Sequence, residues 1–286
     1  MVEAMDILTV LPWDDDVRGI TSGLVDSPPF SWVTEPVRKV RAPVRIRVDA
    51  QGGLHLLGNA REIVHLGSDG ALLGRTPLPT TSAAIVTDYA CDAARECVVL
   101  EKGRLVRSDA GGALRWSREV RDDFTKVLLD EGRWRLYLRV KRDGAEVAEL
   151  DGDTGSDVGV LRLHEQAGPA FVAGGRLGYV FLDEESNTRG ISVVHLREGR
   201  STVMPGSAPH YAWLVYPFGM DERSRIYTWR DGRVARITAH DGTIEELDAP
   251  DGTVPPHDFW QVDPSGRVVI PVTTPEGLAI LRSRSG

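Results

Sequence analysis

The sequence predicts an all-β chain that forms a six-bladed β-propeller of four-stranded antiparallel blades. Apolar or β-branched runs end in a tight turn six times, most clearly at 48–52, 220–224 and 262–266. Looser copies lie near Asp92, Asp130 and Gly174. The turn residue Asp263 follows Asp49 by 214 residues, or about 43 residues per step over five steps. A repeat of that length built from short strands is typical of a propeller.

Each unit contains the turn signals that separate four strands. In the fifth unit, residues 225–229 alternate between polar and apolar, and Asp231-Gly232 is a two-residue hairpin signal. Further strands are predicted at 234–238 and 243–247. The first unit repeats this order with strands at 44–48, 54–57, 62–66 and near Leu72, and the third unit has strands at 134–140 and 146–150. The fourth unit has a longer hairpin loop at 183–189.

The sixth unit supplies only three strands, at 259–262, 268–272 and 278–281, before the sequence ends. An unpaired edge would invite aggregation, so the missing strand is expected from the N-terminus. Counting 19 residues back from Asp49, the spacing of fourth strands elsewhere, predicts Phe30–Thr34, with Ile7–Leu11 as the alternative. The expected organisation is an N-terminal arm, 1–28, followed by a single propeller domain, 29–286.

The stretch Arg107-Ser108-Asp109-Ala110-Gly111-Gly112-Ala113-Leu114-Arg115-Trp116 resembles the ending of a PQQ-like propeller repeat, with Asp, Gly and Trp in the expected spacing. Glu149–Gly155 is similar but lacks the tryptophan. The units as a whole resemble NHL-type and PQQ-like repeats over essentially the whole chain. The resemblance implies turn and packing chemistry. It implies no activity, and we expect neither the quinone nor another cofactor.

Composition excludes several partners. A net charge of −8 without a block of basic residues argues against nucleic acid. No apolar run approaches the length of a membrane helix, and the acidic N-terminus differs from a secretory signal. We therefore expect a cytoplasmic protein, from a bacterium with a GC-rich genome because arginine greatly outnumbers lysine. Cys91 and Cys97 flank a turn and could face each other, but free thiols are expected in a reducing compartment.

Polar side chains fall in the loops that lead from one blade to the next inner strand, which is the face that usually carries a propeller's site. The candidate catalytic residues are His210, His257, Asp258, His164, Glu165 and Asp123, and the candidate binding residues are Tyr211, Trp213 and Trp260. Histidines with carboxylates opposite could hold a divalent metal or transfer protons. Polar loops without chemistry explain the same residues, so the metal content stays open.

Two functions remain. The favoured one is a non-enzymatic binding platform for a protein or peptide, because no nucleophile elbow, phosphate loop or metal-spaced histidine pair occurs in the sequence. The alternative is a small-molecule hydrolase or lyase with the histidines and carboxylates at the mouth of the central channel. Fold alone does not decide between them.

Overall fold

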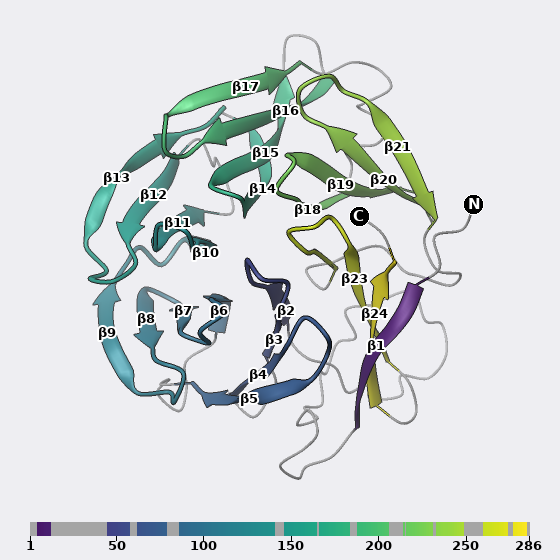
Figure 1. Cartoon of the computed structure of the whole chain (residues 1–286). Helices are drawn as coiled ribbons and strands as arrows, with labels where there is room; N and C mark the ends of the chain where they lie inside the picture. Colours follow the sequence, from purple (N-terminus) through teal and green to yellow (C-terminus); the bar gives the residue numbers. More distant parts are fainter. Residues whose placement is uncertain are drawn as a thin grey trace, which may run out of the picture.

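The computed structural model describes residues 5–12, 45–57, 62–78, 86–140, 146–164, 166–183, 188–205, 214, 216–230, 233–248, 260–273 and 277–284. They form six four-stranded antiparallel sheets around a common centre (Figure 1). The predicted six-bladed β-propeller is confirmed. Among these residues no helix is long and apolar enough to cross a membrane.

Five blades are consecutive in the chain, and the inner strand comes first in each. Blade 1 contains β2 (Arg45–Val48), β3 (Leu54–Leu57), β4 (Glu62–Leu66) and β5 (Leu72–Pro77). Blade 2 contains β6 (Val86–Cys91), β7 (Cys97–Glu101), β8 (Arg104–Ser108) and β9 (Leu114–Glu119). Blade 3 contains β10 (Phe124–Asp130), β11 (Arg135–Val140), β12 (Glu146–Asp151) and β13 (Asp157–Arg162).

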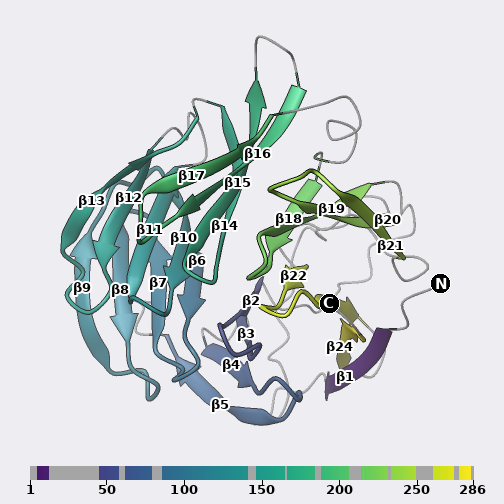
Figure 2. The same ribbon diagram turned by 45° about the horizontal axis from the view of Figure 1, so that its top comes forward.

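The fourth and fifth blades continue this order, and the sixth differs. Blade 4 contains β14 (Ala167–Ala173), β15 (Arg176–Asp183), β16 (Thr188–His195) and β17 (Arg200–Met204), and blade 5 contains β18 (Tyr216–Met220), β19 (Arg225–Arg230), β20 (Arg233–Thr238) and β21 (Ile244–Asp248). Blade 6 contains β22 (Gln261–Val262), β23 (Val268–Thr273), β24 (Gly277–Ser283) and β1 (Met5–Pro12). Figure 1 shows the outer strands β9, β13 and β17 on the outside of the ring, and in Figure 2 β9 and β13 again lie at its outer edge.

The turn after the inner strand is held by an aspartate side chain. Asp49 Oδ1 accepts hydrogen bonds from the backbone N–H groups of Gln51 and Gly53, both at 2.8 Å. Asp221 accepts the same two bonds, from the residues two and four positions further on. Gly52 closes the first of these turns at φ = 79°, a left-handed conformation that glycine adopts without a Cβ clash. The repeated aspartate is therefore a structural part of the turn.

The N-terminal strand β1 closes the ring by pairing antiparallel with β24, from Met5 opposite Ser283 to Pro12 opposite Gly277. The preference for Phe30–Thr34 is therefore wrong, and the alternative, Ile7–Leu11, is the closing strand. The expected arm cannot contain Met5–Pro12, and the rest of residues 1–28, like Phe30–Thr34, lies outside the described residues. Spacing misled because the closing strand need not keep the repeat's connection length.

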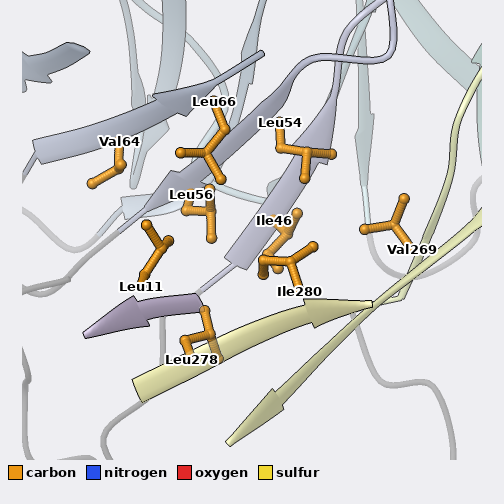
Figure 3. Close-up of a cluster of buried hydrophobic side chains, with 9 residues drawn as sticks. All are labelled: Leu11, Ile46, Leu54, Leu56, Val64, Leu66, Val269, Leu278 and Ile280. Atoms are coloured by element: carbon orange, nitrogen blue, oxygen red, sulfur yellow. The ribbon is translucent and has the colours of Figure 1, made fainter. Parts of the chain in front are cut away.

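The closing strand is buried against the first blade. Leu11, on β1, is 6% exposed and belongs to a cluster with Leu278 and Ile280 of β24 and with Leu56 and Val64 of blade 1. Figure 3 shows these side chains converging between the two blades. Arg282 of β24 adds hydrogen bonds to the carbonyl groups of blade 1, one of them to Gly52 at 2.8 Å. Blade 6 is thus joined to blade 1 by apolar packing and by side-chain hydrogen bonds.

The two cysteines form a disulfide between β6 and β7, so the prediction of free thiols is wrong. Cys91 and Cys97 lie directly opposite each other in the register of the two strands, with their Cα atoms 4.1 Å apart. The turn that they flank, closed by a hydrogen bond from Arg95 N–H to the Asp92 carbonyl, brings the two sulfur atoms together.

The closing strand gives a direct test of this architecture. We expect Leu11→Ala to lower the free energy of unfolding by about 2–4 kcal/mol, because it leaves a cavity between blades 6 and 1. Ile7→Ala, in the same strand but at a side chain 66% exposed, should change it by less than about 1 kcal/mol. Urea unfolding followed by tryptophan fluorescence measures both, and equal losses would contradict the described orientation of β1.

Candidate binding site in the central channel

A cavity of about 700 Å³ lies at the centre of the ring, and inner-strand residues of all six blades line it. It extends from the beginnings of the inner strands, near Arg45 and Thr87, to their ends, near Glu131 and Met220. A second cavity, of about 460 Å³, lies among the turns that follow the inner strands and shares Glu131 with the first. The centre of the propeller is therefore hollow along the inner strands.

The larger cavity has a basic lining. Among the described residues that line it, the cationic ones are Arg45, Arg47, Lys126 and Arg139, and the single acidic one is Glu131. Arg139 is 7% exposed, and its guanidinium donates to the carbonyl oxygens of Ala167 and Gly168 in blade 4. Burial lowers the pKa of Arg139 from its usual value. This lining contrasts with the net charge of −8 of the whole chain.

One buried carboxylate orients the two arginines of blade 1. Asp88, on β6, is 0% exposed and accepts hydrogen bonds from the guanidinium groups of both Arg45 and Arg47. Its second oxygen, Oδ2, accepts the backbone N–H of Val127 in blade 3 at 3.0 Å. Arg47 Nε also donates to the Tyr89 carbonyl, 3.2 Å away. Asp88 thus joins blades 1, 2 and 3 at the wall of the cavity and balances one of two cationic charges.

Two inner strands begin irregularly next to polar residues of the cavity wall. The register of β10 shifts between Phe124 and Lys126, and that of β6 shifts between Val86 and Asp88. Thr125 and Lys126, at the first of these shifts, and Thr87, at the second, are among the residues that line the cavity. A β-bulge commonly changes the direction of a side chain.

Glu131 is the acidic group of the channel, and it joins the same three blades at the opposite end. It follows β10 in blade 3, and its carboxylate accepts the backbone N–H groups of Ala50 in blade 1 and Ala93 in blade 2. Burial raises its pKa to about 7, with smaller contributions from the negative charges of Asp49 and Asp92 and an opposing effect of the two hydrogen bonds. The carboxyl group therefore changes its charge near neutral pH.

Two of the six candidate catalytic residues fall in the described part of the chain, and each is engaged locally. His164 Nδ1 lies 2.7 Å from the Tyr179 hydroxyl, and its ring stacks on Phe181 with centroids 4.1 Å apart. Asp123 is exposed and forms an ion pair with Arg121, two residues away, which lowers its pKa. Neither residue is among those that line the central cavity.

The other candidate catalytic residues, His210, His257, Asp258 and Glu165, lie outside the described residues, so a His and carboxylate centre stays a prediction. The candidate binding residues Tyr211 and Trp213 also lie outside them. Trp260 is described: it lines the cavity but is only 4% exposed, and its ring packs edge-on against Phe218 with centroids 5.4 Å apart.

Sequence reasoning missed the basic lining because it looked for chemistry in the loops. The signal was present in the inner strands. Arg45-Ile46-Arg47 in blade 1 alternates charged and apolar residues, and Lys126 lies two residues after Phe124 in the inner strand of blade 3. An inner strand is packed by blades on both sides, so a charge there needs a partner or a cavity. Charged residues within inner strands are therefore the feature to look for.

Comparison with known proteins agrees with the fold. No family model matches the chain, and no curated protein sequence is significantly similar to it. Hydrazine synthase of Kuenenia stuttgartiensis is similar in structure, with a TM-score of 0.54 and 10% identity over 89% of this chain and 99% of that one. Hsv2 of Kluyveromyces lactis has a TM-score of 0.53 and 12% identity over 80% and 71% of the two chains.

A third structure, BamB from Moraxella catarrhalis, has a TM-score of 0.42 and 16% identity over 100% of this chain and 92% of that one. At these identities the likeness shows the fold alone. The chain is therefore similar to known propeller structures in its architecture, and its function has to be inferred from its own site.

The raised pKa of Glu131 predicts a pH-dependent stability. The folded-state pKa, about 7, lies above the ordinary value of 4.5 for a glutamate, so the folded protein binds more protons between these values and its free energy of unfolding falls as pH rises. We expect this fall to be roughly 2 kcal/mol smaller in Glu131→Gln than in the wild type. Urea unfolding at pH 5 and pH 7.5 measures the difference.

The control for this prediction is Glu119→Gln, which removes a carboxylate from an exposed position at the end of β9. The prediction is wrong if the free energies of unfolding of the wild type and of Glu131→Gln change by the same amount between pH 5 and pH 7.5. Glu131 would then have the same pKa in the folded and the unfolded chain.

Proposed function

We propose that the protein is a non-enzymatic binding platform that takes an acidic, extended segment of a partner protein into its central channel. The observation that carries this proposal is the charge of the cavity: among the described residues, four cationic side chains and one carboxyl line it, in a chain with a net charge of −8. Charge complementarity of this kind steers a partner and sets its orientation.

The positions of the charges favour carboxylates as ligands. Asp88 balances one of the charges of Arg45 and Arg47, and Arg139 is bound only to backbone carbonyls among the contacts described above. Glu131, with a pKa of about 7, carries only part of a negative charge at neutral pH. Among the described residues that line the cavity, cationic side chains therefore outnumber acidic ones, and a carboxylate that enters the cavity would meet them.

The rest of the lining favours a segment that also carries apolar side chains. Leu128, Phe171, Met220 and Trp260 contribute to the wall, and the volume of about 700 Å³ is within the range of ligand cavities. An extended peptide places alternate side chains on opposite sides, so it can offer carboxylates and apolar groups to different parts of one wall. This supports a peptide over a small, fully charged ion.

A cytoplasmic location, as expected from the sequence, is part of this proposal. The absence of an enzymatic role is also part of it, supported by the local engagement of His164 and Asp123.

Fluorescence anisotropy with a labelled peptide of about eight residues that alternates glutamate and valine tests the proposal. We expect saturable binding that weakens as salt is added, and much weaker binding of the matched peptide with glutamine in place of glutamate. Lys126→Glu should reduce the affinity about ten-fold or more, since it reverses one charge in the cavity.

The matched control is Lys102→Glu, at an exposed hairpin position outside the cavity. It makes the same charge change to the whole protein and should leave binding unaltered. The proposal is contradicted if the glutamate and glutamine peptides bind with equal affinity, or if the two lysine substitutions change the affinity equally. Binding of succinate without binding of the peptide would replace the protein partner with a small dicarboxylate.

A further inference from the structure

Two histidines face each other inside the space between blades 1 and 2. His55 on β3 and His65 on β4 are paired in register, and they are 1% and 0% exposed. Their Nδ1 atoms lie 2.7 Å apart. Cys91, on β6 of blade 2, lies beside them: one ring nitrogen of each histidine and Cys91 Sγ all lie within 4.8 Å of one another.

The repeat itself does not require histidines at these positions. The residue six positions after the turn aspartate is His55 in blade 1 but Val98 and Val269 in blades 2 and 6, and the residues opposite these valines are arginines. The arginines, Arg107 and Arg282, reach the backbone carbonyls of the next blade. Blade 1 departs from this pattern at both positions at once, and the exchange places two imidazoles against a cysteine.

Hydrogen-bond polarity fixes the direction in which the imidazoles donate. The Thr76 hydroxyl gives its single proton to the Ala110 carbonyl, 2.9 Å away, so at 2.8 Å it accepts the N–H of His65 Nε2. His55 Nε2 lies 3.1 Å from Asp49 Oδ2, and Asp49 Oδ1 already accepts two backbone N–H groups. Both Nε2 atoms therefore carry protons directed at acceptors.

It follows that two Nδ1 lone pairs point at each other across 2.7 Å. Such an arrangement is repulsive unless a positive centre lies between them, either a shared proton or a metal cation. A histidine that ligates a metal through one nitrogen usually donates the other N–H to a carboxylate, hydroxyl or carbonyl. The bonds to Asp49 and Thr76 have this form, and they leave both lone pairs free to bind a cation next to Cys91.

We propose that His55, His65, Cys91 and Cys97 form a binding site for a divalent cation of the zinc type, which is open only when the disulfide is reduced. Two thiolates and two imidazoles are a common tetrahedral set for zinc. Cys97 Sγ, now bonded to Cys91 Sγ, supplies the fourth ligand. Bond lengths of about 2.3 Å to sulfur and 2.0 Å to nitrogen require ligand separations of roughly 3.5 Å, so the two Nδ1 atoms and the two sulfur atoms have to move apart when the cation binds.

The reaction that opens the site is thiol–disulfide exchange with a dithiol. The dithiol gives two electrons and two protons to the Cys91–Cys97 disulfide, the S–S bond breaks, and the dithiol closes to its own cyclic disulfide. The cation then displaces one proton from each cysteine. Binding therefore releases the two thiol protons to solution.

The site lies next to the channel, and its occupation would have a structural consequence. Cys91 is among the residues that line the central cavity. The disulfide lies within blade 2, whereas the cation would hold residues of blades 1 and 2 together. Reduction thus breaks the covalent bond within blade 2, and the bound cation then connects blade 1 to blade 2.

Cobalt(II) tests the site because its visible spectrum reports tetrahedral thiolate coordination. The chelator-treated full-length protein is reduced with dithiothreitol, desalted under argon and titrated with cobalt chloride. We expect one cobalt per chain, with thiolate charge-transfer and strong d–d bands, and none in the oxidised protein. Titration in a weakly buffered solution should show the two thiol protons released per cation.

Variants separate the ligands from their surroundings. The double variant Cys91→Ser/Cys97→Ser should abolish the thiolate bands, and Thr76→Val, which keeps all four ligands but removes the acceptor of His65, should weaken cobalt binding about ten-fold or more. His240→Ala, at a histidine whose side chain is 72% exposed, should keep one cobalt with unchanged affinity. Reduced, folded protein without thiolate bands, or bands that survive in the double cysteine variant, would overturn the site. If the double variant does not fold, an unchanged affinity in Thr76→Val overturns the coordination through Nδ1.

Discussion

The pairing of β1 with β24 is the contact on which the rest of the molecule depends, because it joins the two ends of the chain in one sheet. Without it, blade 6 has three strands and an open edge, and the inner strands of blades 1 and 6 have no fixed relation. Leu11 and Arg282 then convert this sheet into a packed contact with blade 1. The central cavity exists because this closure holds six inner strands around one axis.

Polar interactions are concentrated where blades 1, 2 and 3 meet. Asp88 and Glu131 each connect all three blades, one along the inner strands and the other at the turns that follow them. The histidine pair lies between the first two of these blades, and Cys91 belongs both to that cluster and to the cavity wall. A ligand in the channel and a cation between the blades would therefore act on the same junction.

Sequence periodicity predicted the blades closely, and for individual strands to within a few residues, because each blade is built from local hairpins. Periodicity was less successful for features that depend on contacts between residues far apart in the sequence. Phe30–Thr34 satisfied the spacing, yet the strand that pairs with β24 is Met5–Pro12. The predicted sites lay in loops, whereas the described charges of the cavity come from Arg45, Arg47 and other strand residues, whose importance is visible only when the ring is closed.

Local sequence patterns predict the number of blades, the strand order within each hairpin and the aspartate turns, since these depend on short-range alternation and on side-chain bonds to nearby N–H groups. Tertiary structure decided which N-terminal segment closes the ring, that Cys91 and Cys97 are joined, and that His55 and His65 face Cys91. The physical reason is the same in each case. Sequence spacing constrains neighbours along the chain, but the distances between blades arise only from packing around a closed ring.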